Sequence, residues 1–298
     1  MYLLSRRPVL LLAAALVLTA GCGGASSSTP STAGSGAKGT LRVSGSTTVN
    51  PVAADAATAL RTNSLTITVD TQGGSAGGIT QLGQKQIDVA MSSKPVGDAD
   101  KAAYPKVNFL ATQIGEDAVG IVVDKKVIAG GLTSITKEQL RQVFEGKVSN
   151  WKQVGGPDLD TFVYDKEPGR GTREVLDKFL YGKGNKAPAP PANDARYAIV
   201  GGNEETRTKL LSTPGSVAPL SSAFATGYDK LGVLAVAGVL PTAAHIIDKT
   251  YQLSRPLFLV TDGEPKGLAK TFIDYVLSDA GQKLVTKHGY LTLAQLKG

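Results

Sequence analysis

The sequence predicts a mixed α/β fold. Short segments rich in β-branched residues alternate with segments of helical length along most of the chain. Small polar turns of Gly, Ser and Thr separate several of these strand and helix segments. Because strands that alternate with helices are joined by crossover connections, we expect mainly parallel sheets.

The first 39 residues precede this pattern and differ in character. Arg6 and Arg7 are followed by an apolar run at 9–18 and by small residues up to Cys22. These features are typical of a secretory signal peptide, and the apolar run is shorter than the roughly 20 residues of a membrane helix. We expect residues 1–21 to be a lipoprotein signal peptide; the alternative is a retained membrane helix.

Cys22 is the only cysteine of the 298 residues, which excludes a disulfide within the chain. The residues before it resemble a bacterial lipobox, although Thr19 stands where that motif most often has Leu. We expect an exported protein whose lipid on Cys22 holds it at the extracytoplasmic face of the cell membrane. An ordinary secretory signal with a spare thiol is the alternative. Residues 22–39, rich in Gly, Ser and Thr, predict a flexible tether.

The globular part alternates strands and helices from its start. Its first half predicts strands at 41–43, 65–69, 87–91 and 119–123 and helices at 51–61 and 78–85. Thr136 and Gln139 have capping-box spacing, and they open a helix that ends near Gly146. Further on we expect strands at 161–164 and 257–260, a Pro-rich loop at 186–194, and helices at 172–181, 266–277 and 280–288.

Three small polar turns each follow a predicted strand and precede a predicted helix. They are Ser44–Thr48, Gly73–Gly78 and Gly169–Thr172. The first turn of a helix carries unpaired N–H groups and partial positive charge, so such turns can hold an anion. Any one turn alone is better explained as an ordinary helix cap, and it is the occurrence of three that favours an anion site. Ser92 and Ser93 form a fourth candidate cluster, with a plain turn before Pro95 as its alternative.

Basic residues accompany the third turn, and the overall charge is positive. Lys166, Arg170 and Arg173 flank this turn, within a sequence of net charge +7. A buried oxyanion needs charged donors, and an arginine can bind two of its oxygens. Arg173 fits a surface residue paired with a nearby acid better than a ligand contact. No Lys/Arg block with interleaved aromatics is present, so we expect no nucleic-acid partner.

The ordered set of motifs resembles the phosphate-binding proteins of ABC phosphate importers. The segments that carry it are S-G-S-T-T-V-N-P from Ser44, G-G-S-A-G-G from Gly73, I-D-V-A-M-S-S-K-P from Ile87, T-K-E-Q-L-R-Q-V-F-E-G-K-V-S-N-W from Thr136, G-R-G-T-R-E from Gly169 and S-R-P-L from Ser254.

The resemblance implies a two-lobed type II solute-binding fold, with mixed sheets flanked by helices and two crossing strands as the hinge. The lobes would be 40–115 plus 256–298 and 116–255, crossed near 116–123 and 252–259. The implied ligand contacts are Ser46, Thr47, Thr48, Ser75, Ser92, Ser93, Lys166, Arg170, Gly171 and Thr172. The implied function is capture of inorganic phosphate by a monomer and its delivery to ABC permease subunits.

Several positions depart from the family pattern. Arg170 replaces the usual Ser, Lys166 replaces an Arg, and residues 215–220 lack the usual Gly-Tyr. Ser93 stands where longer members carry an Asp that accepts a proton from phosphate and so rejects sulfate. Asp117 and Asp165 are candidates for a replacement acceptor.

Three other functions remain open. The chain could bind another oxyanion of the sulfate, molybdate or tungstate type, or serve as a surface adhesion or signalling protein. A hydrolase would need His245 or His288 beside an exposed serine, and no G-x-S-x-G motif is present. Nucleotide-binding motifs and metal-ligand spacings are also absent from the sequence, so we expect no enzyme, no metal and no cofactor.

Overall fold

The computed structural model describes residues 39–62, 65–185, 187–191 and 194–297. The predicted signal peptide, Cys22 and all but the last residue of the predicted tether lie outside this part, so they stay predictions. Within it, no helix has the length and apolar character needed to cross a membrane.

The first lobe is built on parallel strands. β1 lies between β2 and β3 and is parallel to both, with Val43 opposite Val69 on one side and Val89 on the other. Pro51 occupies the first turn of α1, where its missing N–H has no intrahelical partner to lose. The elements are β1 (Gly39–Gly45), α1 (Asn50–Leu60), β2 (Leu65–Asp70), α2 (Gly74–Gly83), β3 (Val89–Ser92), α3 (Asp98–Ala103), α9 (Gly267–Leu277) and α10 (Asp279–Lys287).

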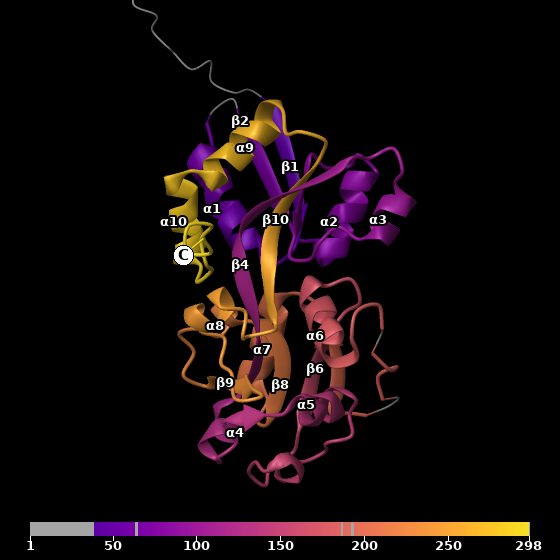
Figure 1. The fold of residues 1–298 in the computed structure, drawn as a ribbon, viewed down its shortest axis with the longest axis vertical. Coiled ribbons are helices and arrows are strands. Elements are labelled where there is room, and N and C mark those ends of the chain that lie inside the picture. The colour runs from indigo at the N-terminus through magenta and orange to yellow at the C-terminus, as the bar shows by residue number, and fades with distance from the viewer. Residues whose placement is uncertain (1–38, 63–64, 186, 192–193, 298) are drawn as a thin grey trace, which may run out of the picture. The chain divides into compact units, whose positions relative to one another are not determined.

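Two antiparallel strands cross from this lobe to the second. β4 (Phe109–Asp124) and β10 (Ser254–Asp262) run side by side (Figure 1), with Arg255 opposite Asp117. From Val119 onward β4 leaves β10 and pairs with β8 and β9 instead. This change of partners at Val119 lies within 116–123, one of the two segments expected to cross between the lobes.

The second lobe repeats the α/β pattern on the other side of the crossing. β6 is parallel to β7 and β8, while β8 and β9 are antiparallel to β4. Its elements are α4 (Lys125–Ala129), β5 (Ser134–Ile135), α5 (Lys137–Phe144), η1 (Trp151–Val154), β6 (Phe162–Lys166), α6 (Gly171–Tyr181), β7 (Tyr197–Val200), α7 (Asn203–Ser212), β8 (Ser216–Ser221), η2 (Ser222–Phe224), β9 (Leu231–Val236) and α8 (Ala243–Ile247).

Each sheet is covered by helices on both faces. In the first lobe α1, α9 and α10 pack on one face and α2 on the other (Figure 1). In the second lobe the side chains of β4 alternate in the same way. Ile121 and Val123 pack in the cluster that includes α5 and α6, and Val122 packs in the cluster that includes α7. The apolar run 119–123 is therefore a strand buried on both faces.

The sheets are mixed, as the family resemblance implies, because the crossing strands run antiparallel to their neighbours beside the expected parallel pairs. Other parts of the sequence-based prediction need correction. α2 begins at Gly74 and not at Gly78, since the glycines of the second turn form the first turn of the helix itself. The stretch 195–250, left unassigned from the sequence, holds β7, α7, β8, β9 and α8. Residues 36–298 form one compact unit, so the exact lobe boundaries stay a proposal.

Candidate functional site

A small cavity lies where loops of the two lobes meet. Nine of the ten predicted contact residues line it, and no lining residue carries a carboxylate. The lining residues are Ser46, Thr47, Thr48, Gly74, Ser75, Ser93, Lys166, Arg170, Gly171, Thr172, Gly201 and Asn203.

Four helices begin at this cavity. The turn that includes Ser46 and Thr48 leads into α1, since Asn50 N donates to Ser46 O at 3.0 Å. α2 begins at Gly74, α6 at Gly171 and α7 at Asn203. Converging helix N-termini present N–H groups and partial positive charge, which suits an anion. The N-terminus of α7 was not predicted from the sequence, because Gly201-Gly202-Asn203 follows a segment with no clear strand pattern.

Three serine hydroxyls form a connected group on the wall from the first lobe. Ser93 Oγ lies 3.0 Å from Ser46 Oγ and 3.2 Å from Ser75 Oγ. Ser46 Oγ also accepts the Thr48 N–H at 3.2 Å, so its own proton goes to Ser93. Ser92 does not line the cavity. Its hydroxyl instead donates to Lys94 O and accepts from Lys94 N.

Lys166 is buried beside the start of α7. Its ammonium donates to the carbonyls of Gly201 at 3.3 Å and Gly202 at 3.2 Å and to the Thr206 hydroxyl. An ammonium has three protons, and these three acceptors match them. In its protonated form Lys166 therefore contributes positive charge to the cavity, while its donors hold the backbone ahead of α7.

Burial, together with the charges of Arg170 and Arg255, lowers the pKa of Lys166 to about 7. Arg170 is the second cation of the lining, and its Nη2 lies 2.7 Å from Glu167 Oε2. A Cβ on Gly74 would come within 2.7 Å of the Arg170 side chain, so a larger residue there would displace that side chain. The basic charge expected from the sequence thus lies at the cavity, with Arg170 already paired to an acid.

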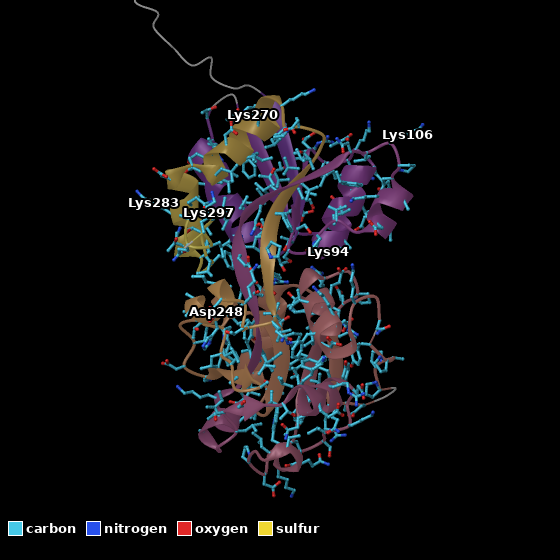
Figure 2. The ribbon with its side chains drawn as sticks, in the orientation of Figure 1. Lys94, Lys106, Asp248, Lys270, Lys283 and Lys297 are labelled. Carbon is cyan, nitrogen blue, oxygen red and sulfur yellow. The ribbon has the colours of Figure 1, made fainter. Side chains whose placement is uncertain are left out.

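The two lobes contact each other around the cavity. Ala76 N donates to Gly169 O at 3.1 Å. A Cβ on Gly171 would lie 2.5 Å from Ser93 Oγ, so only glycine allows this approach. Lys94, labelled in Figure 2 at the level where the lobes meet, forms an ion pair with Glu174 of α6. The lining residues of both lobes are therefore held around one cavity.

Arg255 is a residue that the sequence analysis did not single out as a contact. Its guanidinium, 2% exposed, donates to the hydroxyls of Thr48 and Thr172, each at 2.9 Å. It also forms an ion pair with Asp117 at 2.8 Å. Burial raises the pKa of the Asp117 carboxyl, and the charge of Arg255 opposes that shift. The one available signal was the S-R-P-L segment that contributes to the family resemblance.

The two acids considered as replacement acceptors do not line the cavity. Asp117 is engaged by Arg255, and Asp165 lies 2.5 Å from Arg173. Arg173 also pairs with Asp177 at 3.0 Å, which confirms the expected acid partner, but its side chain is only 11% exposed, so it is not the surface residue that the sequence suggested. No carboxylate of the described residues therefore lines the cavity as an acceptor for a proton on an anion.

Neither histidine lines the cavity. His288 Nε2 lies 2.9 Å from Asp55 Oδ2, and His245 Nδ1 lies 2.9 Å from Leu240 O. Across the residues that the structure describes, no cluster of His, Cys, Asp and Glu has an arrangement that could hold a metal ion. The hydroxyl, amide and cationic donors instead suit the binding of a small oxyanion.

Comparison with known proteins agrees with this geometry. A family model described as the PBP superfamily domain matches residues 30–280. The phosphate-binding protein PstS of Bacillus subtilis is 29% identical over 299 residues, which cover 97% of this chain and 94% of that protein. PstS of Borreliella burgdorferi is 28% identical over 258 residues, or 84% and 89% of the two chains.

Solved structures show the same fold. A putative phosphate ABC transporter substrate-binding protein of Clostridium perfringens, with bound phosphate, superposes with a TM-score of 0.74 at 24% identity, covering 86% of this chain and 100% of that one. An ABC-type phosphate transport receptor of Vibrio cholerae gives a TM-score of 0.66 at 26% identity, covering 85% and 99%.

Proposed function

The chain belongs to the PBP superfamily, and on that premise we propose that it captures inorganic phosphate between its lobes and delivers it to an ABC importer. The similarity to phosphate-binding proteins from several bacteria supports phosphate as the ligand and ABC permease subunits as partners. The protein is then a binding protein and not an enzyme.

One observation carries the proposal: the cavity combines hydroxyls, helix N-termini and two cations without any lining carboxylate. A buried oxyanion is stable only when its oxygens are satisfied by donors, and hydrogen bonds to a charged group contribute about 1.5–3 kcal/mol each. The lining supplies such donors from both lobes. This arrangement supports hinge closure around the anion as the mode of capture.

We also propose export and attachment to the extracytoplasmic face of the membrane through a lipid on Cys22. The basic and apolar start of the sequence, followed by Thr19-Ala20-Gly21-Cys22, supports this location. The Gly/Ser-rich residues 22–39 would give the folded part the reach to meet a permease in the same membrane. Mass spectrometry of the membrane-derived protein tests this, since an unmodified Cys22 contradicts it.

Calorimetric titration with phosphate, sulfate, arsenate, molybdate and tungstate tests the ligand. We expect saturable binding that is tightest for phosphate. Ser46→Ala removes the hydroxyl that donates to Ser93 and accepts from Thr48 N, and Thr172→Val removes a donor from the lining; each should weaken phosphate binding by about 10-fold or more. Thr58→Val, on the exposed side of α1, is the matched control and should bind as the unaltered protein does.

Three outcomes would contradict the proposal, and each supports a different function. If the protein binds another oxyanion more tightly than phosphate, that oxyanion is the ligand. The absence of saturable anion binding favours an adhesion or signalling role. Turnover of phosphate esters by the pure protein indicates a hydrolase.

A further inference from the structure

Arg255 joins residues of both lobes from a position just behind the cavity. Its Nη2 donates to Thr48 Oγ1, which follows β1, and its Nη1 donates to Thr172 Oγ1, in the first turn of α6. Both threonines line the cavity, whereas Arg255 does not. Its effect on a bound anion is therefore exerted through the two hydroxyls.

The hydrogen-bond roles of these hydroxyls follow from what their partners can do. A hydroxyl has one proton and two lone pairs, and a guanidinium can only donate. Thr48 Oγ1 accepts from Arg255 and also from Asn203 Nδ2 at 3.0 Å, so both of its lone pairs are used. Its proton is left to donate. Thr172 Oγ1 likewise accepts from Arg255, which leaves its proton free for a ligand.

The guanidinium is itself held in place. Asp117 Oδ2 accepts from Arg255 Nε at 3.1 Å and Nη2 at 2.8 Å, and Asp117 Oδ1 accepts from Ser221 Oγ at 2.7 Å. Asp117 and Arg255 are also direct partners in the β4–β10 ladder. A planar guanidinium with a fixed carboxylate partner has one orientation, so it aims its remaining donors at fixed points.

We propose that Arg255 is a positioning residue of the anion site. It turns the hydroxyls of Thr48 and Thr172 into fixed donors toward the cavity, one from each lobe, and Asp117 orients it. A fixed donor binds an anion oxygen without first giving up another partner or losing rotational freedom. This inference rests on the proposed function, because it assigns a role at the same site.

Phosphate titration of a double-mutant cycle tests it. Arg255→Lys keeps a charge but cannot span both hydroxyls, so it should weaken phosphate binding by about 10-fold. In a Thr48→Val/Thr172→Val background the same change should cost less than about 2-fold, because the hydroxyls that it acts on are gone. Arg207→Lys is the matched control, since Arg207 contacts Glu204 and the Tyr228 ring away from the lining.

A second variant covers the event that Arg255→Lys does not fold. Arg255→Met/Asp117→Leu replaces both buried charges with apolar groups, a change that folds often tolerate. It should unfold cooperatively and lose phosphate affinity about 10-fold. Unchanged phosphate affinity in either variant overturns the proposed role of Arg255 but not the proposed function. The same holds if Arg255→Lys still weakens phosphate binding about 10-fold in the threonine-free background. No phosphate binding by the unaltered protein instead overturns the proposed function.

Discussion

Lys94 Nζ lies 2.9 Å from Glu174 Oε1, and this ion pair joins the loop after β3 in the first lobe to α6 in the second. The same ammonium lies 3.6 Å from Asp100 Oδ2 within its own lobe. The Lys94 side chain is 11% exposed and that of Glu174 is 43% exposed, so the pair is only partly shielded from water. It lies beside the cavity and ties together the two walls that an anion must contact.

Glu174→Gln should weaken phosphate binding about 2- to 5-fold, because a partly exposed ion pair contributes up to about 1 kcal/mol. Titrations at low and high salt measure the effect, which should shrink as salt screens the pair. Glu264→Gln, at an exposed position in the first lobe, is the control. Equal affinities for Glu174→Gln and the unaltered protein would show that the pair does not assist closure.

Gly171→Ala should reduce phosphate binding by more than about 10-fold, and its clash with Ser93 should also lower the free energy of unfolding. The new Cβ would lie 2.5 Å from Ser93 Oγ and 2.7 Å from Ser93 O, so the two walls must separate. An alanine is otherwise acceptable in the first turn of a helix. Titration and urea unfolding on the same protein separate the two effects.

Gly97→Ala controls for the loss of a glycine, since its Cβ would meet no atom closer than 3.5 Å. It should leave binding unaltered. If Gly171→Ala binds phosphate normally, the close approach of Gly171 and Ser93 is not part of the bound state.

Lys166 should make the free energy of unfolding rise with pH. Its pKa is lowered from 10.5 to about 7 by burial. Between these two values the unfolded chain holds a proton that the folded chain has released, so the free energy of unfolding rises with pH by at most about 1.4 kcal/mol per pH unit. Lys166→Met lacks this contribution.

Urea unfolding of both proteins at pH 6.5, 8 and 9.5 measures the difference, because the other titrating groups are common to both. The unaltered protein should gain stability relative to Lys166→Met from pH 6.5 to pH 8 and again from pH 8 to pH 9.5. Parallel pH profiles would contradict the lowered pKa.

Trp151 should matter for stability and not for binding. It is fully buried in the core of the second lobe, and its Nε1 donates to Gly215 O at 2.8 Å. Trp151→Phe removes this bond and leaves unfilled volume, so it should cost about 2 kcal/mol of unfolding free energy. Phosphate affinity should stay the same, as titration will show; a large loss of affinity would link this core to the cavity.

Local signals in the sequence were enough to place most of the elements and turns. The Thr136 capping box forms as expected, with Gln139 N donating to Thr136 Oγ1 at 3.2 Å. The turns at Ser46, Ser75 and Thr172 each meet the cavity, because a strand, a small polar turn and a helix start are encoded within a few adjacent residues. The alternation of strands and helices likewise placed these turns at one edge of each sheet.

The tertiary structure decided which polar groups the turns meet. Arg255 and Asn203 are 207 and 155 residues away from Thr48 in the sequence, yet both donate to its hydroxyl. Ser92 and Ser93 are adjacent and alike in sequence, but only Ser93 lines the cavity. Local patterns specify backbone conformation, whereas the partner of a hydroxyl or a buried charge depends on which distant segments pack around it. The sequence therefore indicates the turns that carry the donors of the anion site. The orientation of the Thr48 and Thr172 hydroxyls by Arg255 and Asp117 exists only in the folded chain.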